Sequence, residues 1–167
     1  LVGLSGIGKS TALWAILSLY PQTIKHERFE GKQFVHTQIT WVKLDCPRDG
    51  SLAGFCQEFF IAVGKAMGDE HYHKRFRARN INDSLQQMAQ VASTFFIGAL
   101  LIDEIQNLHF AKTGGKDNML NFFLHLVNNI GIPVVFIGTN SMVSLFSDVL
   151  RNARRCCGVG IVEFKRF

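Results

Sequence analysis

The stretch that decides the fold is Gly3-Leu4-Ser5-Gly6-Ile7-Gly8-Lys9-Ser10, which matches the pattern G-x-x-x-x-G-K-[ST] of a phosphate-binding loop. Its glycines let the backbone turn so that successive N–H groups point inward at phosphate oxygens. A helix that begins near Lys9 adds the positive end of its dipole. Because a chance match of two spaced glycines followed by Lys and Ser is rare, the loop predicts a site for a nucleoside triphosphate.

Each position of this loop has an expected task. Lys9 is expected to reach the β- and γ-phosphates of ATP, and Ser10 to offer its hydroxyl to Mg²⁺. Thr11 is expected to contact the α-phosphate. The residues predicted to bind the nucleotide are those of the loop and the start of the helix: Gly3, Ser5, Gly6, Ile7, Gly8, Lys9, Ser10 and Thr11.

A second motif places two carboxylates after four apolar residues, Ala99-Leu100-Leu101-Ile102-Asp103-Glu104. A buried strand here delivers Asp103 to the carboxyl edge of a parallel sheet, where such sheets bind ligands. Asp103 is then expected to hold Mg²⁺ opposite Ser10, and Glu104 to orient and polarise the water that attacks the γ-phosphate. Taken alone, the motif describes a strand that ends in a polar turn equally well. Beside a phosphate loop, the second carboxylate favours ATP hydrolysis over transfer to a bound acceptor.

Two further features complete the expected catalytic site. Asn140 follows the apolar run 133–138, and its amide is expected to bond the γ-phosphate or the attacking water. A role in the turn before Ser141 is the alternative. The next predicted helix ends with three arginines, Arg151, Arg154 and Arg155. One of them, with the last two favoured, is expected to stabilise transition-state charge in a neighbouring subunit. The alternative is that they stabilise the C-terminus of their own helix.

The bulk composition indicates one folded domain. The chain has 167 residues, of which 47% are hydrophobic, with 15 phenylalanines. This length suits a single α/β domain. No apolar run approaches the roughly 18–20 residues of a membrane helix, so no membrane partner is expected. A net charge of +5 permits nucleic-acid binding without establishing it.

Strands and helices are predicted to alternate. Helices are expected over 9–19, over 52–67 with Ser51 as its cap and Gly68 as its end, over 84–92 with Asn82 or Asp83 as its cap, over 118–129 closed by Gly131, and from Ser141 to about 154. Strands are expected over 38–45, 95–102, 133–138 and 160–164, and 22–33 is a polar stretch with a turn at Glu30-Gly31. Uniformly apolar strands favour a parallel sheet flanked by helices on both faces.

The ends of the chain and its cysteines carry fewer predictions. The phosphate loop begins with almost no strand before it, and the chain ends within a predicted strand, so a fragment of a longer protein is expected.

Cys46, Cys56, Cys156 and Cys157 contain no C-x-x-C pair, so reduced thiols are expected rather than a zinc or redox site. His71 and His73 lack further suitably spaced metal ligands.

Four segments in order resemble the AAA+ ATPases: GLSGIGKST at 3–11, LLIDEIQNL at 100–108, VVFIGTN at 134–140 and LRNARR at 150–155. The resemblance covers nearly the whole chain. It implies a P-loop NTPase of the AAA+ type, with residues 1–167 as the nucleotide-binding core. It also implies that the first strand is incomplete and that a helical lid lies beyond Phe167.

Within that group the chain is most similar to transposition regulators of the TnsC/TniB family, through WVKLDCPRDGS at 41–51, the IDEIQNL box and GTNSM at 138–142. This resemblance implies a homo-oligomeric ring or filament on double-stranded DNA in the bacterial cytosol, which uses ATP and Mg²⁺ to link a target-site selector to the transposase. A helicase-loader or replication-initiator ATPase, and a P-loop signalling switch that does not bind DNA, remain the alternatives.

Basic residues in two places are candidates for DNA contacts. One group lies in the segment 69–80 and the other in the loop after the acidic pair: Lys74, Arg75, Arg77 and Arg79, then Lys112 and Lys116. A solvated run of surface charge is the alternative for each group. No base-reading motif is evident, so the expected contacts are with the DNA backbone and tolerate any sequence.

Overall fold

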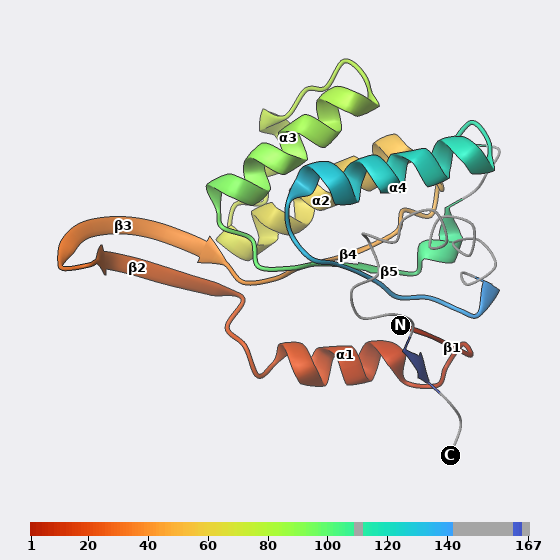
Figure 1. Ribbon diagram of the computed structural model, residues 1–167, viewed down its shortest axis with the longest axis horizontal. Coiled ribbons are helices and arrows are strands. Elements are labelled where there is room, and N and C mark those ends of the chain that lie inside the picture. The colour runs from red at the N-terminus through yellow and green to blue at the C-terminus, as the bar shows by residue number, and fades with distance from the viewer. Residues whose placement is uncertain (109–111, 142–161, 165–167) are drawn as a thin grey trace.

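The computed structural model describes residues 1–108, 112–141 and 162–164 (Figure 1). In chain order its elements are strand β1 (Val2–Gly3), helix α1 (Lys9–Leu17), strands β2 (Thr23–Phe29), β3 (Lys32–Ile39) and β4 (Val42–Asp45), helix α2 (Leu52–Met67), 3-10 helix η1 (Tyr72–Arg75), helix α3 (Ile81–Thr94), strand β5 (Leu100–Asp103), 3-10 helix η2 (Ile105–Asn107), helix α4 (Lys116–Ile130), and strands β6 (Val134–Phe136) and β7 (Glu163–Phe164).

The parallel strands follow one another in the order β4-β5-β6-β1-β7. β5 pairs in parallel with β4 and with β6, and β1 pairs in parallel with β7. A parallel bridge between Val2 and Gly138 joins β1 to the end of β6. The predicted parallel sheet is therefore confirmed. β6 lies between the strand that enters the phosphate loop and the strand that ends at Asp103, so their carboxyl ends meet at one edge.

Helices cover both faces of this sheet, as the sequence predicts. α2, α3 and α4 lie on one side and α1 lies on the other (Figure 1). The larger core fills the first side, where the ring of Phe55 packs edge-on against those of Phe122 and Phe123. On the second side, Leu13 and Leu17 of α1 pack in a smaller buried cluster. Apolar strands are thus covered on both faces, which fixes the sheet under the helices.

An antiparallel hairpin between α1 and β4 is a feature that the sequence analysis did not predict. Among the described strands, β2 and β3 pair only with each other, and they extend away from the sheet (Figure 1). Only the turn at Glu30-Gly31 is confirmed, with φ angles of 47° and 78°. Most of the hairpin is exposed on both faces, so its sequence lacks the alternation of apolar and polar residues that marks a half-buried strand.

Two of the predicted strands differ most from the structure, whereas the predicted strand 133–138 is confirmed as the shorter β6. The predicted strand 38–45 is split, because β3 ends at Ile39 in the hairpin and β4 begins at Val42 in the parallel sheet. The predicted strand 95–102 is wrong in its first half, since β5 begins at Leu100. The N–H of Phe95 still bonds the carbonyl of Val91 in α3. Phe95 closes the helix and Ile97 packs in the core, whereas Phe96, with φ 45°, is exposed, so these residues do not extend the strand.

The helix signals were more accurate. α2 has the predicted bounds, with the Ser51 hydroxyl accepting from the N–H of Gly54 at 3.0 Å and with Gly68 at its end. The cap of α3 is Asn80 rather than Asn82 or Asp83, because its side chain accepts from the N–H of Asp83. α1 ends two residues and α4 begins two residues before the predicted positions. The helix predicted after Ser141 lies outside the described residues. Of the predicted strand 160–164 the structure describes 162–164, where β7 spans Glu163–Phe164.

Candidate nucleotide-binding site

The phosphate loop connects β1 directly to α1. Gly6 and Gly8 have φ angles of 75° and 92°, in the left-handed region that favours glycine. Gly8 precedes the first helical residue and has no side chain with which to cap it. The first N–H groups of α1 therefore face the loop without a side-chain acceptor, which suits them to bind phosphate oxygens.

Lys9 lies across this loop. Its ammonium donates to the carbonyl of Gly3 at 2.9 Å and to that of Leu4 at 2.8 Å. The residue is only 9% exposed. Its charge is thus held at the centre of the loop, where the sequence predicts contact with the β- and γ-phosphates.

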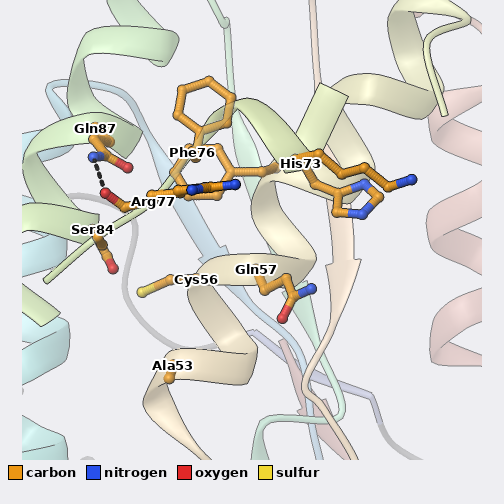
Figure 2. A pocket seen from close by; sticks show the side chains of 11 residues that line it. Ala53, Cys56, Gln57, His73, Phe76, Arg77, Ser84 and Gln87 are labelled. Atoms are coloured by element: carbon orange, nitrogen blue, oxygen red, sulfur yellow. Dashed lines mark hydrogen bonds between the residues drawn. The ribbon is translucent and has the colours of Figure 1, made fainter. Parts of the chain in front are cut away.

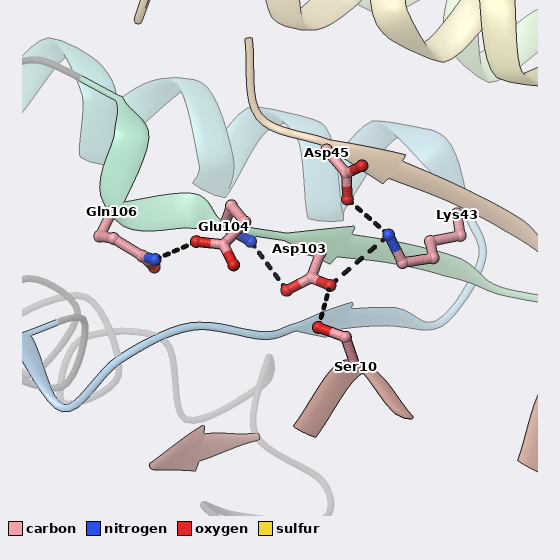
Figure 3. A network of polar contacts seen from close by, with 6 residues as sticks. All are labelled: Ser10, Lys43, Asp45, Asp103, Glu104 and Gln106. Carbon is pink, nitrogen blue, oxygen red and sulfur yellow. Dashed lines mark hydrogen bonds and ion pairs between the residues drawn. The ribbon is translucent and has the colours of Figure 1, made fainter. Parts of the chain in front are cut away.

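Ser10 and Asp103 meet where α1 faces the end of β5. The Ser10 hydroxyl donates to Oδ2 of Asp103 at 2.9 Å, and Oδ1 of Asp103 accepts from the N–H of Glu104 at 2.9 Å (Figure 3). Asp103 is 3% exposed. A hydroxyl and a carboxylate in contact are oxygen ligands of the kind that Mg²⁺ prefers, so this pair fits the predicted metal site.

Lys43 is a charged partner of this site that the sequence analysis missed. Its ammonium lies 3.5 Å from Oδ2 of Asp103 and 2.5 Å from Oδ1 of Asp45 (Figure 3). The Lys43 side chain is 8% exposed and its ammonium lies 5.7 Å from the centre of the Trp14 ring. The available signal was a lysine between the apolar residues Val42 and Leu44 of β4, because a buried ammonium needs a counter-charge.

Glu104 follows β5 in a left-handed conformation with φ 55° and is exposed. Its Oε2 accepts a short hydrogen bond from Nε2 of Gln106 (Figure 3). Oε1 of Gln106 in turn accepts from the N–H of Thr139 at 3.3 Å. Gln106 thus joins the predicted water-activating carboxylate to the segment after β6, a link that the sequence analysis did not anticipate.

Asn140 lies at the same edge of the sheet, two residues after the bridge between Val2 and Gly138. It is exposed, and its side chain makes no hydrogen bond within the part of the chain that the structure describes. Ser5, Gly6 and Thr11 of the phosphate loop are also exposed, whereas Ile7 is half-buried. The predicted arginines, Arg151, Arg154 and Arg155, lie outside the described residues.

The basic side chains of the segment 69–80 have different surroundings. Arg75 pairs with Asp69 at 2.6 Å and its guanidinium lies 5.2 Å from the centre of the Tyr72 ring. Lys74 and Arg77 instead line a cavity of about 570 Å³ between α2, η1 and α3 (Figure 2). The charge of Arg75 is therefore already paired with a carboxylate of the protein. The DNA role of this segment stays a prediction.

The remaining basic candidates lie elsewhere. Lys112 is exposed and near enough to Asp49 for its charge to act there. The Ser51 hydroxyl and then its backbone N–H hold the pKa of Asp49 below its usual value, and Lys112 adds to this. Arg79 is exposed, and Lys116 is the first residue of α4. Arg79 belongs to the same segment, 69–80, as Lys74 and Arg77, whereas Lys112 and Lys116 follow the acidic pair, so both groups stay predictions for DNA contacts.

The two cysteines that the structure describes are buried thiols. Burial raises the pKa of Cys46 far above its usual value and that of Cys56 to about 12. Within residues 1–108, 112–141 and 162–164, no group of three His, Cys, Asp or Glu side chains gathers as a metal site requires. None of the helices described there is long and apolar enough to cross a membrane.

Comparison with known proteins identifies the family. A family model of the AAA domain matches residues 1–146. Cdc6p from Pyrobaculum aerophilum is a similar solved structure, with a TM-score of 0.58 and 16% identity over 99% of this chain and 38% of that chain. At that identity the likeness shows the fold alone, a P-loop fold of the AAA+ type, and the chain spans under two fifths of that protein. No curated protein matches the sequence. Because the family model covers 146 of the 167 residues, the chain belongs to the AAA domain family.

Proposed function

We propose that this domain binds ATP with Mg²⁺ and hydrolyses it. The observation that carries the proposal is the contact between Ser10 and Asp103 at 2.9 Å, beside the ammonium of Lys9 in the phosphate loop. This arrangement gathers a phosphate-binding loop, a cation and two oxygen ligands at one edge of the sheet. Mg²⁺ at Ser10 and Asp103 would neutralise charge on the phosphates.

Each side chain then has a task at this edge. The loop N–H groups and Lys9 bind the phosphates, and Asp103 and Ser10 hold the metal. Glu104 accepts a proton from the attacking water while it orients that water toward the γ-phosphate. Asn140 donates its amide to the γ-phosphate or to the same water.

Replacing Glu104 by Gln tests the hydrolytic part of the proposal. Glu104→Gln is expected to keep ATP affinity and to lower kcat by about a hundredfold or more, because it removes the base and leaves the phosphate loop intact. Glu27→Gln, in the hairpin, removes the same charge away from the site and is expected to leave kcat unchanged. Normal turnover by Glu104→Gln would contradict the assignment.

Replacing Lys9 by Ala tests the binding part. Lys9→Ala is expected to weaken ATP binding itself, measured by calorimetry, because the phosphates lose a buried cation. Lys25→Ala removes a lysine of the hairpin and serves as the control. Undiminished affinity in Lys9→Ala would show that the nucleotide binds elsewhere.

We further propose that the domain works within an oligomer on double-stranded DNA and regulates transposition, linking a target-site selector to a transposase. The support is its resemblance to the TnsC/TniB family at 41–51, 102–108 and 138–142, together with the net charge of +5. The full-length protein is expected to bind duplex DNA only with ATP and to release it steeply as salt rises. Stimulation of a transposase in the same reaction distinguishes this role.

A replication-initiator or helicase-loader ATPase is the second candidate, because Cdc6p shares the fold. ATP-dependent DNA binding combined with helicase recruitment, and no effect on transposase, would favour it. No DNA binding at low salt would exclude both DNA roles and leave a P-loop signalling switch.

The proposed trans arginine has its own test. Subunits carrying Arg154→Ala or Arg155→Ala should partly regain turnover when mixed with Glu104→Gln subunits, because each variant supplies what the other lacks. No recovery in any combination would argue against an arginine acting between subunits.

A further inference from the structure

Gln106 makes one hydrogen bond with each end of its side-chain amide. Nε2 donates to Oε2 of Glu104 (Figure 3). Oε1 accepts from the backbone N–H of Thr139 at 3.3 Å. Only one orientation of the amide satisfies both neighbours. Turned over, it would set its oxygen against a carboxylate and its NH₂ against an N–H donor. The two contacts therefore require an amide rather than a carboxylate of the same size.

Glu104 needs such a partner. Its side chain is exposed and its own backbone has a φ angle of 55°. Apart from Gln106, no side chain within the described residues donates a hydrogen bond to it. A free glutamate side chain samples several rotamers, and fixing it costs conformational entropy of about 1–2 kcal/mol. A bond from Gln106 restricts that motion before any substrate arrives.

We propose that Gln106 is a positioning residue for hydrolysis. Its amide holds one carboxylate oxygen of Glu104, leaves Oε1 free for the attacking water, and fixes the carboxylate relative to the segment after β6. The inference rests on the proposed function, in which Glu104 activates water. Thr139 immediately precedes Asn140. The Gln106 amide therefore also fixes the position of Glu104 relative to Asn140, the other residue proposed to act at the γ-phosphate.

Gln106→Glu is the decisive variant, because it keeps the side-chain length and an acceptor for the N–H of Thr139. It replaces the donor that faces Glu104 by a like-charged acceptor. We expect kcat to fall roughly tenfold to a hundredfold, the effect of misplacing a catalytic group by about 1 Å, with ATP affinity unchanged. Gln106→Leu, which loses both bonds, should lose kcat to a similar extent. Asn107→Asp adds the same charge one residue along and should leave kcat unchanged.

Two kinetic outcomes would overturn the inference. If Gln106→Glu kept full kcat while Gln106→Leu lost it, the tie to Thr139 alone would matter. If both kept full kcat, Gln106 would have no part in turnover. A fall in ATP affinity equal to the fall in kcat would indicate a general structural role instead.

A measurement without turnover separates this inference from the proposed function. In nucleotide-free protein, the side-chain amide protons of Gln106, assigned by their loss in Gln106→Leu, should resonate downfield by NMR because they donate to a carboxylate. Glu104→Ala should remove that shift, and an unmoved signal would overturn the inference. If the wild-type protein hydrolyses no ATP while the NMR result holds, the proposed function fails and the Gln106–Glu104 contact stands.

Discussion

The hydroxyl of Ser10 donates to Oδ2 of Asp103 at 2.9 Å, although the two residues are 93 positions apart in the chain. Ser10 belongs to α1, the helix after the phosphate loop. Asp103 ends β5, which is separated in the sheet by β6 from β1, the strand before that loop. Each already satisfies the other, so a metal ion that takes both oxygens must replace this bond. In the proposed site, binding of Mg²⁺ would therefore be an exchange at a preformed pair.

Ser10→Ala removes one oxygen of the pair and should weaken the contribution of Mg²⁺ to ATP binding. The wild-type protein is expected to bind ATP more tightly with Mg²⁺ than with EDTA, and the variant should lose about tenfold of that difference. Calorimetric titrations with and without the metal measure it. Ser18→Ala, at the far end of α1, is the control. An undiminished Mg²⁺ effect in Ser10→Ala would exclude the hydroxyl as a ligand.

Lys43→Met should destabilise the fold by about 3 kcal/mol, because it leaves the buried Asp103 carboxylate without its cation. Denaturant unfolding measures the change. In the Lys43→Met, Asp103→Asn double variant the loss should be smaller than the sum of the single losses, since the carboxylate that Lys43→Met leaves unpaired, apart from that of Asp103, belongs to the exposed Asp45. Lys65→Met, at an exposed position of α2, controls for loss of a lysine. Strict additivity would show that the two residues are not coupled.

Gly64→Ala should destabilise α2 although alanine favours helices by about 1 kcal/mol. A Cβ on Gly64 would lie 2.5 Å from the carbonyl oxygen of Asp69 and 2.8 Å from Cβ of Tyr72. Moving the backbone after α2 to relieve this should cost about 1–3 kcal/mol. Thermal unfolding decides the sign, and a rise in Tm would show that the segment yields easily.

Cys56 should make stability depend on alkaline pH. Burial raises its pKa to about 12 from 9.0, so above pH 9 the unfolded chain loses a proton that the folded protein keeps. The free energy of unfolding should then fall as pH rises from 9 toward 12, by at most about 1.4 kcal/mol per pH unit for this thiol. Cys56→Ala should show a shallower fall in urea unfolding between pH 8 and 10.5. Identical slopes would mean that Cys56 ionises equally in both states.

What the sequence could predict depended on local chemistry. α2 begins after Ser51 and ends at Gly68 as expected, because a capping hydroxyl and a left-handed glycine each form contacts with residues close in the sequence. The phosphate loop and Asp103 were found by spacing and by an apolar run. The AAA family of the chain is confirmed by comparison, while the roles of the site residues remain predictions.

What it could not predict depended on distant contacts. Beside its local partner Asp45, Lys43 also faces Asp103 on the next strand. Beside Glu104, Gln106 also contacts Thr139, 33 positions away, and no local pattern indicates either distant contact. The first half of the run 95–102 has strand composition, yet Phe95 closes α3, Ile97 is buried in the core and Phe96 is exposed. No local pattern distinguishes these uses of the same residue types.

The ammonium of Lys9 donates to the carbonyls of Gly3 and Leu4, so the loop itself supplies the hydrogen-bond acceptors for this lysine. In the proposed complex a phosphate would have to outcompete those carbonyls, and the affinity for ATP would be the difference between two sets of contacts. Lys9→Ala removes a partner from both sets. The affinity lost in that variant will therefore understate the attraction between the lysine and the phosphates, and the variant's loop should also become more mobile before any nucleotide is added.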